Sequence, residues 1–122
     1  MTQIISALSD VSDRYDALFV DLWGCVHNGV DAFPDAIAAL QAYRSRGGTV
    51  VLVTNAPRPR ASVTAQIAGF GIPDDAWDTI ATSGDSARTA MYRGAVGKKV
   101  FFIGEARDSN FFDPIGVVDD PV

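Results

Sequence analysis

Polar side chains that can act on a phosphate group stand where short apolar runs of the sequence end. Asp21 closes the first run, Thr54 and Asn55 close the second, and Thr82–Asp85 follow a third. A carboxylate, ionised at neutral pH, can act as a nucleophile or bind magnesium. A hydroxyl and an amide beside a helix start can donate to phosphate oxygens. Each residue alone is more typical of a helix cap or a turn, but the combination at two strand ends favours phosphate chemistry.

Four apolar runs, rich in β-branched or aromatic residues, predict the strands that would position these groups. They cover residues 17–20, 49–53, 79–81 and 100–103, the third being the weakest. The first, second and fourth are apolar at successive positions, which is typical of a strand covered on both faces in a parallel sheet. Ligands of open parallel sheets bind beyond the carboxyl ends of the strands. The polar groups are therefore expected to meet at one edge of the sheet.

Helical patterns alternate with these runs. They are a short leading helix through Ile4, Ile5 and Leu8, a helix from Pro34 to before Gly47-Gly48, a helix carrying Val63, Ile67 and Phe70 that stops at Gly71, and a helix from about Asp85 to Arg93 with Ser83 or Asp85 as its cap. Proline suits the first helical position and glycine suits a helix end. Alternating strands and helices predict an α/β fold with a parallel sheet, a Rossmann-like three-layer α/β/α core.

Length, charge and cysteine content narrow the class of protein. With 122 residues, 48% of them hydrophobic, the chain fits one globular domain. The net charge is −5 and no basic stripe is present, so neither nucleic acid nor a membrane is an expected partner. No apolar run is long enough to span a bilayer, and the N-terminus lacks the pattern of a signal peptide. The single cysteine, Cys25, rules out an internal disulfide, and a cytoplasmic location is the default expectation.

The motifs resemble those of haloacid dehalogenase (HAD) superfamily phosphatases. The first motif of that family is an aspartate that closes the first strand and leads into a turn containing glycine, as in Asp21-Leu22-Trp23-Gly24-Cys25-Val26-His27-Asn28-Gly29. Val53-Thr54-Asn55 resembles the second motif. The Thr-Asn pair, Phe70-Gly71, Thr82-Ser83-Gly84 and Lys99–Glu105 resemble the subgroup that contains p-nitrophenyl phosphatase and pyridoxal phosphatase. The resemblance extends from about Tyr15 to Glu105.

The resemblance implies a mechanism and a cofactor. Asp21 would attack phosphorus and form an aspartyl-phosphate, which water would hydrolyse, while Thr54 and Asn55 would hold the transferred group. Mg²⁺ would bind the carboxylate of Asp21, the backbone carbonyl of Trp23 and a later aspartate. The expected substrate and partner is a small phosphorylated metabolite, hydrolysed as a phosphate monoester, and a homo-oligomer is compatible with the sequence. A cation is needed because a dianionic ester repels Asp21.

The sequence departs from the family pattern at two points. The family's general acid and base, an aspartate two residues after the nucleophile, is replaced by Trp23. The later lysine and acidic metal-binding motif have no candidates in the right place. We therefore expect the chain to be the N-terminal part of a HAD-like core: a leading helix over about 1–14, a core over about 15–105, and at 106–122 the start of a connection to a cap domain. The cap and the C-terminal half of the core would be absent, and the chain alone would be inactive.

Two further residues and two other functions stay open at this point. His27 is the only histidine and could supply the proton that Trp23 cannot, although a turn or surface position is more common for a histidine. Arg58 could reach an anionic substrate, although it is also typical of a solvated helix start. One alternative function is a non-catalytic HAD-like binding or interaction protein that has lost its acid. The other is a phospho-accepting receiver domain, whose phosphorylated aspartate, however, follows the third strand.

Overall fold

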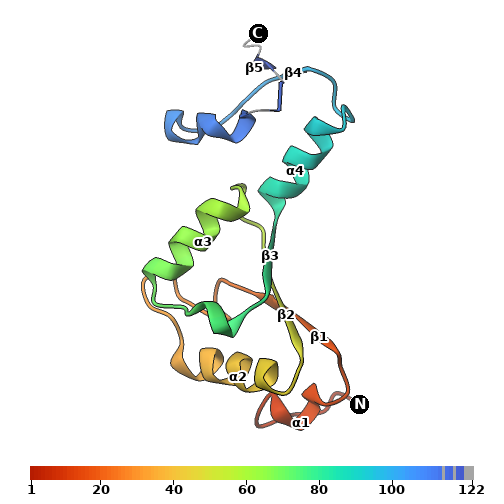
Figure 1. The fold of residues 1–122 in the computed structure, drawn as a ribbon, viewed down its shortest axis with the longest axis vertical. Coiled ribbons are helices and arrows are strands. Elements are labelled where there is room, and N and C mark those ends of the chain that lie inside the picture. Colours follow the sequence, from red (N-terminus) through yellow and green to blue (C-terminus); the bar gives the residue numbers. More distant parts are fainter. Residues whose placement is uncertain (114, 117, 120–122) are drawn as a thin grey trace. The chain divides into compact units, whose positions relative to one another are not determined.

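Two parallel strands form the centre of the part of the molecule that carries Asp21. β1 (Ala17–Asp21) pairs with β2 (Thr49–Thr54) in continuous register, from Ala17 opposite Thr49 to Asp21 opposite Val53 (Figure 1). β3 (Thr79–Thr82) completes a three-stranded sheet of order β1-β2-β3. The predicted α/β fold with a parallel sheet is confirmed, and the first two strand ends that carry polar groups are neighbours.

This computed structural model describes residues 1–113, 115–116 and 118–119, which fall into two units. The first unit comprises residues 1–54 and 64–80, and the second comprises the described residues of 55–63 and 81–122. Within these residues no helix is long and apolar enough to cross a membrane.

α2 (Pro34–Ser45) packs beside the two strands of the first unit, as the sequence predicted. Proline occupies a first-turn position, and Gly47 follows the helix with a φ of 89°, a conformation that suits glycine. Tyr43 is buried, and its hydroxyl donates to the carbonyl oxygen of Tyr15 at 2.6 Å. A Cβ on Gly48 would overlap the Tyr43 ring. The glycine pair therefore both ends the helix and admits the tyrosine that ties it to the start of β1.

The other helices agree with the sequence except at their ends. α3 (Arg60–Gly69) is followed by the short 3₁₀ helix η1 (Asp74–Ala76), and α4 (Ser83–Tyr92) follows β3 directly. The expected cap of α4, Ser83 or Asp85, is wrong. Thr82 is the N-cap, and its Oγ1 accepts the N–H of Asp85 at 2.8 Å. Thr82 keeps the extended backbone of a strand, the conformation that an N-cap requires, so a single residue serves both elements.

The leading helix is much shorter than predicted. α1 covers only Ser9–Ser12, and Ile4 and Ile5 are exposed ahead of it. The Asp10 carboxylate accepts the N–H groups of Ser6 and Ala7, at 2.9 and 3.1 Å. These bonds stabilise a turn before the helix. A segment of this length has little intrinsic helical stability, so the local turn prevails.

The fourth predicted strand is also shorter and lies in a different sheet. β4 (Lys99–Val100) pairs with β5 (Val118–Asp119) as a separate parallel pair. Of the two aromatic residues after Val100, Phe101 is exposed and Phe102 packs against the 3₁₀ helix η2 (Ala106–Phe112). The rings of Phe102 and Phe112 meet edge to face, with a centroid distance of 5.1 Å. The sequence also predicts a short strand at Gly116-Val117-Val118, of which Val117 lies outside the described residues.

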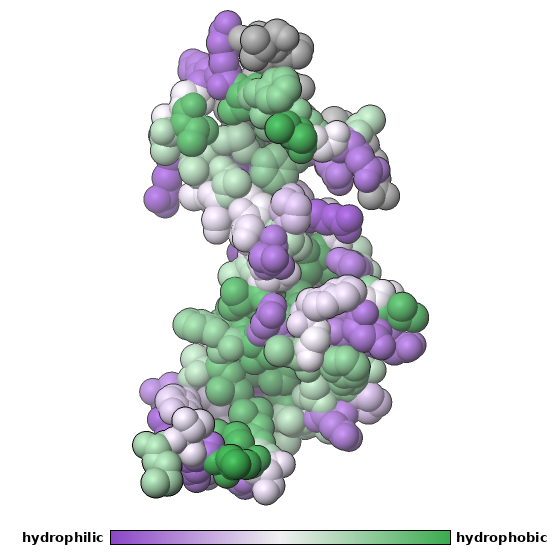
Figure 2. Space-filling model, turned by 180° about the vertical axis from the view of Figure 1, so that it is seen from behind, coloured by the Kyte–Doolittle hydropathy of each residue, from purple (hydrophilic) through white to green (hydrophobic). Residues whose placement is uncertain are grey.

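An apolar face of the first unit is exposed. Along β1 exposed and half-buried residues alternate, and the side chain of Phe19 is 78% exposed. The next strand adds Val53, and Figure 2 shows the apolar surface of this unit in green. We expected a strand covered on both faces, and within the described residues β1 is not covered on the face that carries Phe19. An alternating burial pattern arises because successive side chains of a strand point to opposite faces.

Candidate active site

Asp21 is the last residue of β1, and its carboxylate is exposed. Oδ1 accepts the backbone N–H of Leu22 at 2.8 Å, while the Leu22 side chain is buried in the core. One carboxylate oxygen is thus oriented by the main chain. An exposed carboxylate with a fixed orientation at the end of a parallel strand is suited to attack an electrophile or to bind a hard cation.

The turn after Asp21 is closed by backbone hydrogen bonds. The N–H of Val26 donates to the carbonyl of Leu22 at 2.9 Å, and that of Gly24 donates to the carbonyl of His27 at 2.8 Å. Gly24 has a φ of 78°, a left-handed conformation that costs glycine little. Val26 is fully buried beneath the turn. The glycine of the predicted motif is therefore needed for backbone geometry, and it holds Trp23 and His27 beside the carboxylate-bearing strand end.

His27 is buried in this turn, with only 4% of its surface exposed. Its Nδ1 accepts the N–H of Gly29 at 3.0 Å, which requires a lone pair on Nδ1 and places the proton of the neutral ring on Nε2. The ring contacts Phe70 at a centroid distance of 4.8 Å. Burial lowers the pKa of His27 below its ordinary value, and the nearby Asp21 carboxylate offsets part of this effect. The geometry suits a residue that braces the turn, and the proton-donating role of His27 stays a prediction.

The pKa of His27 predicts how stability depends on pH. Because the folded pKa lies below the ordinary 6.5, the unfolded chain takes up a proton more readily, so stability is complete above that value and falls as the pH drops below it. In His27→Asn, Oδ1 keeps an acceptor near the Nδ1 position but does not titrate. Between about pH 7.5 and about pH 5, we expect the midpoint temperature of thermal unfolding to decrease for the parent and to decrease less for the variant. Equal slopes would contradict this account.

Thr54 lies beside Asp21, and Asn55 begins the second unit. Thr54 directly follows Val53, the register partner of Asp21, so the two polar residues end adjacent parallel strands. Its side chain is half-buried. Asn55 comes next in the chain and is exposed. The structure thus brings the predicted nucleophile and the predicted phosphate-binding threonine to one edge of the sheet.

In the second unit, Arg58 packs tightly against the start of α4. A Cβ on Gly84 would overlap the backbone of Arg58, and the N–H of Gly84 donates to the carbonyl of Ala56 at 3.1 Å. Asp85 accepts the N–H of Arg60 at 3.2 Å and forms an ion pair with its Nε at 3.4 Å. Asp85 therefore joins the first turns of α3 and α4, a role that was not predicted from the sequence. Gly84, which follows Thr82-Ser83 in the sequence, is the signal that could have indicated the close approach of the Arg58 backbone to the start of α4.

The donors of the first unit fit part of a magnesium site. The Asp21 carboxylate and the Trp23 carbonyl are oxygen ligands, which Mg²⁺ prefers, and this cation usually keeps several waters. Within the described part of the chain no three His, Cys, Asp or Glu side chains gather into a metal-binding group. These two donors could therefore hold the cation together with water and further ligands.

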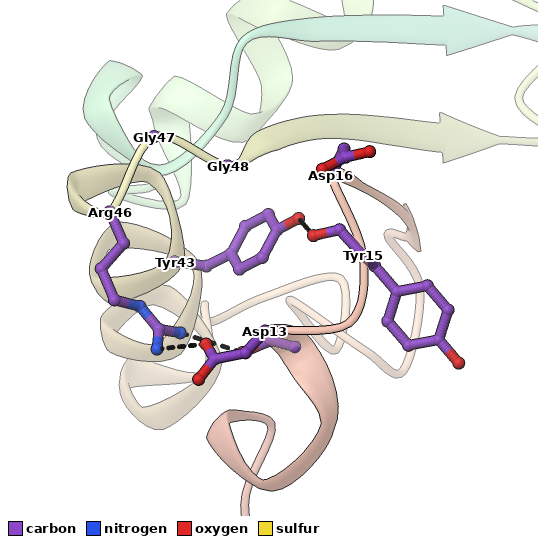
Figure 3. Close-up of a pocket in the computed structure, with 8 residues that line it drawn as sticks. Asp13, Tyr15, Asp16, Tyr43, Arg46, Gly47 and Gly48 are labelled. Carbon is purple, nitrogen blue, oxygen red and sulfur yellow. Dashed lines mark hydrogen bonds and ion pairs between the residues drawn. The ribbon is translucent and has the colours of Figure 1, made fainter.

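A polar hollow of about 340 Å³ lies at the opposite end of the strands (Figure 3). It is lined by Ser12, Asp13, Tyr15, Asp16, Tyr43, Arg46, Gly47 and Gly48. Arg46 donates to Asp13 at 2.7 Å and to the Ser12 hydroxyl at 2.9 Å, and the Tyr43 hydroxyl is bonded to Tyr15. The bonds among these lining residues connect the start of the sheet to α1 and α2. The hollow lies at the amino ends of β1 and β2, so it is not the candidate active site.

Comparisons with known proteins identify the family of the chain. The sequence model of a family described as haloacid dehalogenase-like hydrolase matches residues 18–118. A hydrolase of the haloacid dehalogenase-like family from Brucella suis 1330 is 43% identical, with a TM-score of 0.89 over 97% of this chain and 43% of its own. A 4-nitrophenylphosphatase from Thermotoga maritima, 20% identical, has the same fold, with a TM-score of 0.70 over 89% of this chain and 42% of its own. No curated protein matches the chain by sequence. The chain therefore spans less than half the length of these two solved structures.

Proposed function

The chain belongs to the haloacid dehalogenase-like hydrolases, and we propose that it carries the nucleophile half of a magnesium-dependent phosphatase site. Asp21 attacks the phosphorus of a small phosphate monoester and forms an aspartyl-phosphate, with release of the alcohol. Water then attacks that phosphorus and releases inorganic phosphate, which restores the carboxylate. Both steps are displacements at phosphorus, in which positioning and charge neutralisation supply most of the rate.

The observation that carries this proposal is the pair Asp21 and Thr54 at adjacent ends of two parallel strands. Asp21 supplies an exposed carboxylate whose Oδ1 accepts the Leu22 N–H. Thr54 supplies a hydroxyl, and Asn55, the next residue, supplies an amide that donates to phosphoryl oxygens. Asp21 and the Trp23 carbonyl would hold Mg²⁺, whose positive charge would offset the negative charge of the phosphoryl group.

Metal removal tests the proposal most directly. The purified full-length protein is expected to hydrolyse p-nitrophenyl phosphate in the presence of Mg²⁺ and to lose that activity in EDTA, with recovery when Mg²⁺ is restored. Release of p-nitrophenol is followed by absorbance. Unchanged activity in EDTA would contradict the metal dependence, and the absence of hydrolysis under all conditions would contradict the phosphatase.

Trp23 supports a second candidate function, a non-catalytic member that binds a phosphorylated ligand. The residue stands two positions after Asp21 and carries no group that can transfer a proton. General acid–base catalysis is typically worth about 10²–10⁴-fold in rate, so its loss could leave a binding protein. Binding of inorganic phosphate in Mg²⁺ by calorimetry, without turnover of any ester, would favour this alternative.

A further inference from the structure

Trp23, two residues after the proposed nucleophile, has a large aromatic side chain that stays exposed. Its side chain is 67% exposed, although a tryptophan has enough apolar surface to make burial strongly favourable. The backbone at Trp23 belongs to the closed turn that follows Asp21, because the next residue, Gly24, bonds to His27. The residue that carries the ring is therefore fixed in the turn, two positions after Asp21.

The indole ring of Trp23 packs against residues of the same turn, Gly29 and His27. A Cβ on Gly29 would overlap Cζ3 of Trp23 and would lie 2.5 Å from Cη2, so the ring rests directly on the glycine backbone. The His27 ring meets it edge to face, at a centroid distance of 5.8 Å and an interplanar angle of 88°. His27 is itself buried against Phe70. An ordered ring with an open face can receive another ring with little loss of conformational entropy.

We propose that Trp23 is a specificity-determining residue, an aromatic platform that binds the planar leaving group of an aryl phosphate. This proposal rests on the phosphatase function proposed above and names its substrate class. Stacking does not require the proton transfer that Trp23 cannot perform. Aryl oxides also leave more readily as anions than alkoxides do, so a site without an acid at this position is matched to the substrates that a ring platform selects.

Binding of two inert analogues isolates the contribution of the ring. Phenylphosphonate and methylphosphonate carry the same anionic head group, and neither can be hydrolysed by attack on an ester. In the full-length protein with Mg²⁺, we expect phenylphosphonate to bind about tenfold more tightly. Trp23→Leu should reduce this ratio several-fold, and Trp23→Phe should retain much of it. Tyr15→Leu, which removes an exposed ring at the other end of β1, is the matched control and should change neither affinity.

Hydrolysis gives a second, independent measurement. Aryl and alkyl phosphates whose leaving groups have the same pKa differ in shape but not in their need for an acid. The parent should show a higher kcat/KM for the aryl ester, mainly through a lower KM, and Trp23→Leu should remove that preference. If the parent and Trp23→Leu prefer the aryl ester over the alkyl ester to the same degree in kcat/KM, the proposal that Trp23 is an aromatic platform is overturned.

The two proposals fail in different ways. Magnesium-dependent hydrolysis with no preference for phenylphosphonate in the parent overturns the platform and leaves the phosphatase standing. Ring-dependent binding of phenylphosphonate without hydrolysis of any ester keeps the platform and overturns the phosphatase. If neither phosphonate binds and no ester is hydrolysed, both proposals are wrong.

Discussion

Asp21→Asn is expected to abolish phosphatase turnover in the full-length protein while leaving its fold intact. An amide is a poor nucleophile and a weaker ligand for a hard cation, so both the attack on phosphorus and the metal site are lost. The change is small in structure, because the asparagine Oδ1 can still accept the N–H of Leu22. Turnover should fall to well below about a tenth of the parent rate, the range expected for loss of a covalent nucleophile.

A matched variant separates this effect from general damage to the turn. Asp31→Asn makes the same chemical change at another exposed aspartate a few residues later, and Asp31 is tied to Asn28 through its backbone groups. Its turnover should stay close to that of the parent. Thermal unfolding of both variants should match the parent within a few degrees, as is usual for exposed substitutions. Residual turnover above about a tenth in a folded Asp21→Asn would remove Asp21 from the mechanism.

The second large effect concerns the dependence of the rate on the leaving group. Because the Trp23 side chain cannot protonate the departing oxygen, esters of acidic phenols should react much faster than esters of ordinary alcohols. The difference should exceed that of a relative with aspartate at this position by about 10²–10⁴-fold, the usual contribution of general acid catalysis. Kcat/KM for a series of phosphates with leaving groups of increasing pKa measures the slope.

Two variants assign the proton donor. Trp23→Asp should flatten the slope, because it restores a carboxyl group that can donate. His27→Ala should leave the slope steep, because the neutral ring of His27 is buried and already uses Nδ1 as an acceptor for Gly29. A shallow slope in the parent that becomes steep in His27→Ala would instead identify the histidine as the acid. If neither substitution changes the slope, the role assigned to Trp23 is wrong.

The neighbourhood of Asp21 is set by short-range patterns, and these could be recognised without a structure. An apolar run followed by Asp21 predicted a strand end, and Pro34 with the glycines after Arg46 predicted the limits of α2. Backbone conformation at such places depends on residues a few positions apart, through proline and glycine geometry and through the apolar spacing. The family motifs are local for the same reason, and the family match confirmed the resemblance that they indicated.

Contacts between distant segments decided the rest. The burial of His27 depends on Phe70, a residue of another segment, and the position of the Trp23 ring depends on the absence of a Cβ at Gly29. Phe102 packs on η2 and does not extend the strand that ends at Val100. The Asp10 carboxylate binds backbone N–H groups and stabilises a turn where a helix was predicted. Aromatic packing and solvent exclusion act across space, so a local pattern does not record them. The sequence by itself therefore indicated the candidate nucleophile, whereas tertiary packing decided that His27 is buried within the turn and that the Trp23 ring remains exposed.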